Sequence, residues 1–166
     1  MKRIHIEHTY NCLPQTYWEK LWDADVRGER ERKGCGALSF TVVESRWDGD
    51  TYHQVVVLEE TVDAPRAVRR IFGETSTIEE TSRWKKDSDT VHLNYQPSIM
   101  SDKVSMVGSL TCAPEGTEHC RVVMDVEITA DIFLVGGIIE GIISKAMPKR
   151  QAKDVDYFNA HQAGTK

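Results

Sequence analysis

The chain has 166 residues, of which 40% are hydrophobic and 28% are charged, and its formal net charge is −5 at pH 7. A chain of this length buries a substantial core, so we expect a single domain over residues 1–166. The mildly acidic balance, without a basic stripe, excludes the electrostatic footprint of a nucleic-acid-binding protein.

The start of the chain and its longest apolar run indicate where in the cell the protein is found. Residues 1–10 alternate apolar and polar side chains and lack the apolar core of a signal peptide. The longest apolar run, residues 132–143, is interrupted by Glu140 and is shorter than the ~20 residues that a membrane span needs. We therefore expect a cytoplasmic protein with no integral membrane segment.

The first third of the chain predicts one strand and two helical segments. Residues 4–10 alternate as a strand with one inward face does. Pro14 suits the first position of a helix, and Tyr17, Trp18 and Leu21 follow at helical spacing. The highly charged residues 24–34 predict a second short helix or a loop, and their charge places them at the surface.

From Gly36 the apolar period changes to two, which is typical of strands. A short helix between Pro65 and Gly73 interrupts the strands, and a long helix bent by Pro148 ends the chain. The expected strands cover residues 37–47, 51–62, 77–85, 90–98, 103–112 and 119–130, and the final helix covers residues 136–161. A run of strands with helices at its ends indicates an α+β fold with an antiparallel sheet.

The four cysteines carry no recognisable site. Cys12, Cys35, Cys112 and Cys120 form no CxxC pair, and structural zinc needs four ligands at recognisable spacing. A disulfide between Cys112 and Cys120 would require an oxidising compartment. We expect four reduced thiols, no metal and no cofactor.

The stretch "LPQTYWEKLWD", with Pro14, Trp18, Leu21 and Asp23, resembles the opening helix of the START-like (SRPBCC, helix-grip) superfamily. The "PEGT" hairpin and "VGGIIE" at the start of the last helix resemble an uncharacterised bacterial branch of it. The resemblance implies a curved seven-stranded antiparallel sheet wrapped around a long C-terminal helix, with short helices after the first strand. It also implies an apolar cavity between sheet and helix.

The candidate cavity residues lie on the more apolar face of each strand and on the apolar stripe of the last helix. They are Phe40, Glu80, Trp84, Leu93, Tyr95, Met106, Met124, Ile139, Ile142, Ile143 and Met147. The strand over residues 51–62 is apolar on both faces, so its inward face stays open. A register shift of one residue would reverse any of these assignments.

Three residues are weak candidates for chemistry. Glu80 is either a carboxylate in an apolar pocket, suited to general acid catalysis, or a solvated residue at the rim. His8 is a hydrogen-bonded core residue or a base, and Tyr95 either donates to a ligand or fills the core. The chain has no GxSxG or HExxH motif and no phosphate-binding glycine loop.

Three functions remain open. The first is a module that binds or carries a hydrophobic small molecule or lipid in the cavity without chemistry. The second is a cyclase-like or hydratase-like enzyme acting on a polyketide or related carbonyl compound with Glu80, His8 and Tyr95. The third is a filled core whose surface binds a partner. The missing motifs and the apolar inner face favour the first.

Overall fold

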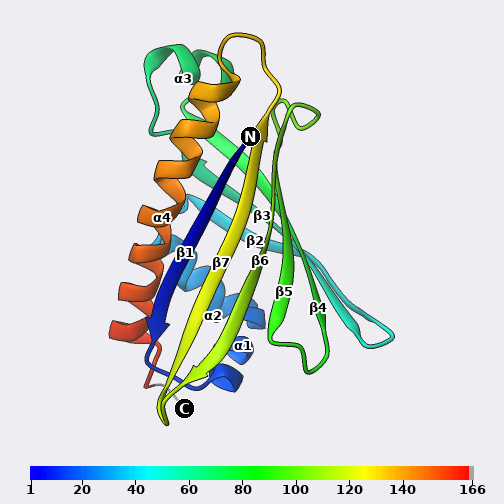
Figure 1. Cartoon of the computed structure of the whole chain (residues 1–166), viewed down its shortest axis with the longest axis vertical. Helices are drawn as coiled ribbons and strands as arrows, with labels where there is room; N and C mark the ends of the chain where they lie inside the picture. Colours follow the sequence, from blue (N-terminus) through cyan, green and yellow to red (C-terminus); the bar gives the residue numbers. More distant parts are fainter. Residues whose placement is uncertain (165–166) are drawn as a thin grey trace.

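The computed structural model describes residues 1–164 (Figure 1). The strands are β1 (Lys2–Tyr10), β2 (Ser39–Asp48), β3 (Thr51–Thr61), β4 (Thr75–Lys85), β5 (Thr90–Pro97), β6 (Val104–Glu115) and β7 (His119–Ala130). The helices are α1 (Pro14–Trp22), α2 (Ala24–Glu29), the π-helical turn η1 (Arg30–Gly34), α3 (Arg66–Phe72) and α4 (Gly136–His161).

Within residues 1–164 the strands form one antiparallel sheet of seven strands, in the order β1-β7-β6-β5-β4-β3-β2. β2 to β7 pair with one another in chain order, with α3 in the connection between β3 and β4, and β1 joins the free edge of β7. The helix α4 runs along one side of the sheet, with α1 and α2 at its lower end and α3 at its upper end (Figure 1). This architecture confirms the predicted α+β helix-grip fold.

The alternation of burial along the strands confirms the predicted inner face. On β7, side chains from Cys120 to Ala130 are buried at every second position. On β3, Gln54, Val56 and Leu58 are buried, which settles the inward face that the sequence left open. Leu38, which lies just before β2, is exposed.

The first helix anchors one end of the core through aromatic packing. Tyr17, Trp18 and Leu21 are buried, as their helical spacing predicts. Tyr17 makes edge-on contacts with Tyr10 of β1, whose ring in turn meets Phe158 of α4 edge-on. The rings of α1, β1 and α4 therefore lock the lower end of the molecule.

The predicted apolar stripe of α4 is only partly correct. Ile139 is buried and Ile142, Ile143 and Met147 are half-buried, whereas the neighbouring Ile138 is 53% exposed. Glu140, which interrupts the apolar run of residues 132–143, is buried and accepts a hydrogen bond from the backbone N–H of Ala130. No helix within residues 1–164 is long and apolar enough to cross a membrane.

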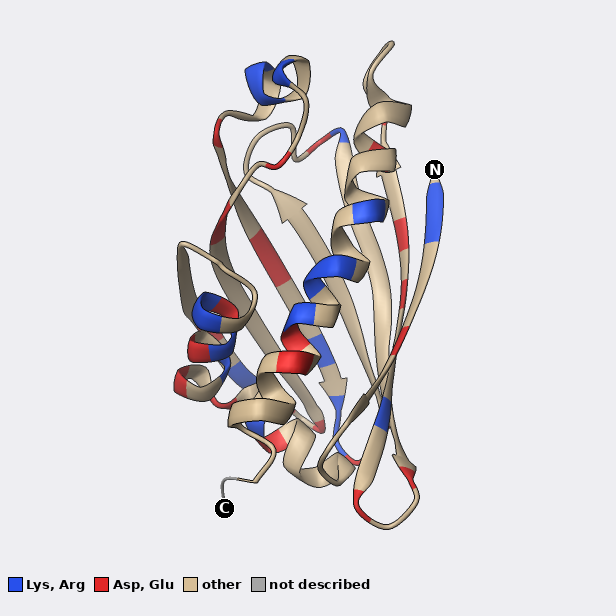
Figure 2. Cartoon of the chain, turned by 90° about the vertical axis from the view of Figure 1, so that its left-hand side faces the viewer, with Lys and Arg blue, Asp and Glu red and all other residues tan. Residues whose placement is uncertain are grey.

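The charged segment that we expected at the surface is partly inside the molecule. Arg27, Arg30 and Glu31 are only 5%, 2% and 4% exposed. Because they are spaced at i, i+3 and i+4, they lie on one face of the α2–η1 segment, and this face packs against the core. Figure 2 shows the charged segments of this region, at the lower left, beside the second half of α4.

Two adjacent glycines at the start of α4 differ in their surroundings, and this difference is testable. A Cβ on Gly136 would overlap the carbonyl oxygen of Ala130, whereas a Cβ on Gly137 would meet nothing within 4 Å. Gly136→Ala should therefore lower the free energy of unfolding by about 1–3 kcal/mol. Gly137→Ala, the matched control, should be neutral or slightly stabilising because alanine favours helix. Urea unfolding measures both, and equal effects would contradict the packing described here.

Candidate functional site

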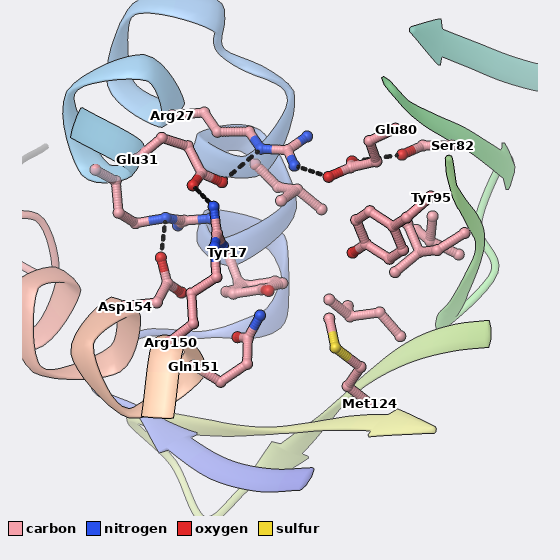
Figure 3. A pocket seen from close by; sticks show the side chains of 15 residues that line it. Tyr17, Arg27, Glu31, Glu80, Ser82, Tyr95, Met124, Arg150, Gln151 and Asp154 are labelled. Atoms are coloured by element: carbon pink, nitrogen blue, oxygen red, sulfur yellow. Dashed lines mark hydrogen bonds and ion pairs between the residues drawn. The ribbon is translucent and has the colours of Figure 1, made fainter. Parts of the chain in front are cut away.

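Two small adjoining cavities lie between the sheet and α4 (Figure 3 shows the first). The polar cavity has a volume of about 30 Å³, and six charged side chains line it: Arg27, Arg30, Glu31, Glu80, Arg150 and Asp154. The apolar cavity has a volume of about 70 Å³, and Leu58, Ile78, Met106 and Met147 line its apolar part. Both cavities are also lined by Glu80, Tyr95, Arg150 and Gln151, so they form one site with a polar and an apolar end.

Arg27 connects the α2 helix to the middle of the sheet. Its Nη2 donates to Glu80 on β4 over 2.6 Å, and its Nη1 donates to Gln54 on β3 over 3.4 Å. Glu80 also accepts a 2.9 Å hydrogen bond from the hydroxyl of Ser82. All four side chains are buried, so these contacts replace the water that each group loses on folding.

Glu31 and Arg150 extend the cluster from the interior towards the surface. Arg150 of α4 donates through Nη2 to Glu31 and through Nε to Glu60 of β3, the latter over 2.6 Å. The side chain of Arg150 is 25% exposed, whereas that of Glu31 is only 6% exposed. Arg150 therefore spans the gap between α4 and the sheet at the rim of the site.

Arg30 and Asp154 form the third pair. Nε of Arg30 lies 2.8 Å from Oδ1 of Asp154, which also accepts a 2.6 Å hydrogen bond from Tyr10 through Oδ2. The guanidinium of Arg30 lies near the rings of Tyr17 and Phe158, 6.0 and 5.5 Å from their centroids. Such cation–π contacts compensate part of the cost of burying the charge.

The electrostatics of the cluster favour the charged forms of Arg27 and Glu31. Burial alone would lower the pKa of Arg27, but the carboxylates of Glu80 and Glu31 outweigh it and raise that pKa. Burial would likewise raise the pKa of Glu31, but Arg150, Arg27 and Arg30 outweigh it and lower that pKa. Burial, followed by the Glu80 carboxylate, raises the pKa of Tyr95 well above its usual range. The Tyr95 hydroxyl therefore stays protonated at neutral pH.

The site includes part of the set of residues expected from the sequence. Glu80 and Tyr95 are direct cross-strand partners and line both cavities. Leu93 and Met124 line the polar cavity, and Met106 and Met147 line the apolar one.

Other expected residues are not among those that line either cavity. Phe40 packs with Val56 and Leu58, and Trp84 stacks on Trp18. The remaining ones are Ile139, Ile142 and Ile143, which pack at the α3 end of the core, and His8, which lies half-buried on β1.

The sequence reasoning missed the charged residues of the site, which are Arg27, Arg30, Glu31, Arg150 and Asp154. Their spacing carried a signal: Arg27 and Glu31 are four residues apart, as are Arg150 and Asp154. Gly34 continues the first of these faces, and a Cβ there would press on the ring of Tyr157. A glycine packed against another helix indicates that this face is buried.

The described residues contain no cluster of three or more His, Cys, Asp or Glu side chains that could hold a metal ion. Cys35 donates from Sγ to Asp154 over 3.7 Å, and Cys12, Cys112 and Cys120 are buried.

A family model described as "Protein of unknown function (DUF2505)" matches residues 5–160. The chain belongs to the DUF2505 family. No curated protein matches the sequence.

Several solved structures share the fold of this DUF2505 protein. The Zhui aromatase/cyclase from Streptomyces sp. R1128 is 15% identical, with a TM-score of 0.67 over 99% of this chain and 100% of that one. A START superfamily protein from Mycobacterium smegmatis is 9% identical, with a TM-score of 0.65 over 95% and 97%. Norcoclaurine synthase from Thalictrum flavum is 14% identical, with a TM-score of 0.61 over 97% and 87%. These likenesses show that the fold is START-like.

The lowered pKa of Glu31 predicts a pH-dependent contribution of this residue to stability. Because the folded-state pKa of Glu31 is below its ordinary value of 4.5, its contribution is present above that pH and is lost as the pH falls below it. Glu31→Gln should lower the free energy of unfolding by about 3–5 kcal/mol at pH 7. The difference from the parent protein should narrow towards pH 3.5.

The matched control is Glu79→Gln, which changes an exposed carboxylate next to Glu80 on the outer face of β4. It should alter the free energy of unfolding by less than about 0.5 kcal/mol at both pH values. Urea titrations at pH 7 and 3.5 measure the free energy of unfolding of both variants and of the parent protein. A loss for Glu31→Gln that is the same at both pH values would contradict its ionised, paired state.

Proposed function

We propose that the protein binds and carries a small, largely apolar molecule in the two adjoining cavities between the sheet and α4. The observation that supports this most directly is the apolar cavity beside the polar one, with Glu80, Tyr95, Arg150 and Gln151 common to both. Apolar walls with a few convergent polar groups are typical of small-molecule sites.

The volumes limit the size of the molecule. Both cavities together are smaller than the ~150 Å³ of an engineered cavity that binds benzene. A compact ring compound fits if the flexible side chains of Met106 and Met147 adjust, as methionine does at adaptable sites. A whole lipid chain requires a larger opening between α4 and the sheet.

A cyclase-like enzyme is the second candidate function. The protonated hydroxyl of Tyr95 next to Glu80 supports it, because an acid could polarise a carbonyl group there. The Zhui aromatase/cyclase and norcoclaurine synthase, which share the fold, are enzymes by their names. Binding without chemistry has more support, because Glu80 is engaged by Arg27 and Ser82, and His8 lines neither cavity.

A cytoplasmic location is also part of this proposal. The four cysteines support it, because all of them are free thiols in the described part of the chain. Free thiols are the usual state of cysteine in a reducing compartment.

Toluene binding, followed through methionine methyl groups, tests the proposed function. Toluene should shift the NMR signals of ¹³C-labelled methyl groups of Met106 and Met147, which line the apolar cavity. The methyl signals of Met1 and Met100, which line neither cavity, should stay in place. Uniform small shifts of all the methyl signals, or none at millimolar toluene, would reject the cavity as a binding site.

Filling the apolar cavity should abolish this binding. Met147→Trp places a larger side chain in the cavity, so it should weaken toluene binding at least about tenfold with little change in stability. Ile138→Trp is the matched control, because Ile138 lies on the same helix and is largely exposed. If Met147→Trp instead unfolds the protein while Ile138→Trp does not, the site is close-packed core.

A further inference from the structure

Several donors at the polar cavity have no acceptor. Nη1 of Arg30 is buried and makes no hydrogen bond to any residue that the structure describes, whereas Nε of Arg27 faces Oε1 of Glu31 at 3.6 Å. The hydroxyl of Tyr95 and the side-chain amide of Gln151 likewise have no hydrogen-bond partner within residues 1–164. Figure 3 shows Tyr95 from the sheet and Gln151 from α4 both directed into this space.

The carboxylates of the cavity are already occupied. Glu80 accepts from Arg27 and Ser82, and Glu31 accepts from Arg150. Asp154 accepts from Tyr10 and Cys35 and lies against Arg30. The cavity therefore has donors to spare and no spare carboxylate, so an occupant must supply an acceptor.

The formal charges of the cavity lining cancel. Three guanidinium groups, those of Arg27, Arg30 and Arg150, face three carboxylates, those of Glu31, Glu80 and Asp154. An additional carboxylate or ammonium group would be a buried charge without a counter-charge, which is costly. The acceptor that fits is an uncharged oxygen.

We propose that the polar cavity recognises a carbonyl oxygen of an uncharged ketone, ester or amide whose apolar body fills the apolar cavity. This rests on the proposed function and adds the chemical class of the ligand. The carbonyl oxygen accepts from the hydroxyl of Tyr95 on the sheet, and the amide of Gln151 lies on the α4 side of the same cavity. The raised pKa of Tyr95 keeps this donor protonated over the neutral range.

A matched series of phenyl compounds tests the proposal. Acetophenone, ethylbenzene, phenylacetate and 1-phenylethylamine share the ring and differ in the polar group. Titration at pH 7, followed by the methionine methyl signals, should give acetophenone an affinity about tenfold or more above each of the other three. A factor of ten corresponds to one good hydrogen bond.

The outcomes distinguish failure of carbonyl recognition from failure of the proposed binding function. If ethylbenzene binds as tightly as acetophenone, water satisfies the donors, and carbonyl recognition is rejected while the binding function stands. Tightest binding of phenylacetate would also reject it, in favour of an anion site. If none of the four compounds binds, the binding function itself is overturned.

Tyr95→Phe removes one donor and keeps the ring. Acetophenone should then bind about tenfold more weakly, whereas ethylbenzene should bind as before. Tyr157→Phe is the matched control, because Tyr157 lies on α4 outside both cavities and should change neither affinity. An equal loss for both compounds in Tyr95→Phe would mean that the residue only packs, and would overturn its role as donor.

A vibrational measurement gives an independent readout. The carbonyl stretch of bound ¹³C-labelled acetophenone should lie at lower wavenumber than in a hydrocarbon solvent, because the oxygen accepts strong hydrogen bonds. In Tyr95→Phe the band should move back towards the solvent value. A bound ketone with a hydrocarbon-like band in the parent protein would show that its oxygen does not reach the donors.

Discussion

The ion pairs buried between the α2–η1 segment, the sheet and α4 are the interaction on which the interior depends. Arg27 reaches Glu80 on the sheet, and Glu31 meets Arg150 on α4. None of these groups is tolerable inside a protein without its partner, because an unpaired buried charge costs several kcal/mol. Ion pairs therefore fix the positions of the α2–η1 segment, the sheet and α4 relative to one another. Aromatic and aliphatic packing stabilises the ends of the molecule.

This arrangement explains why the space between sheet and helix is small and divided. Long guanidinium side chains occupy the part of the interior that apolar side chains of the sheet would otherwise line, and they leave only narrow gaps beside them. The sheet supplies the apolar walls with Leu58, Ile78 and Met106, so polar and apolar recognition meet at Glu80 and Tyr95. In the proposed binding function, such a site selects its ligand by the polar group as much as by shape.

The sequence predicted the strands, the helices and their buried faces much better than the charged residues of the interior. Alternation in β7 and the helical spacing in α1 are local signals, and both predicted the buried face correctly. The α2–η1 segment was misjudged because charged residues normally face water. Its partners are distant, since Arg27 and Glu80 are 53 positions apart and Glu31 and Arg150 are 119 apart. No local pattern reveals a counter-charge at that separation, so the arginines that line the polar cavity could not be found from the sequence around them.

The position of Arg150 has a kinetic consequence. Its contact with Glu60 is partly exposed, unlike its contact with Glu31, so dissolved salt screens the outer contact more strongly than the inner one. In the proposed binding function, a molecule that enters between α4 and β3 meets this side chain, which contacts both Glu31 and Glu60. Ionic strength would then change how fast the interior exchanges its contents, while the final occupancy, which depends on the shielded groups behind Arg150, would change little.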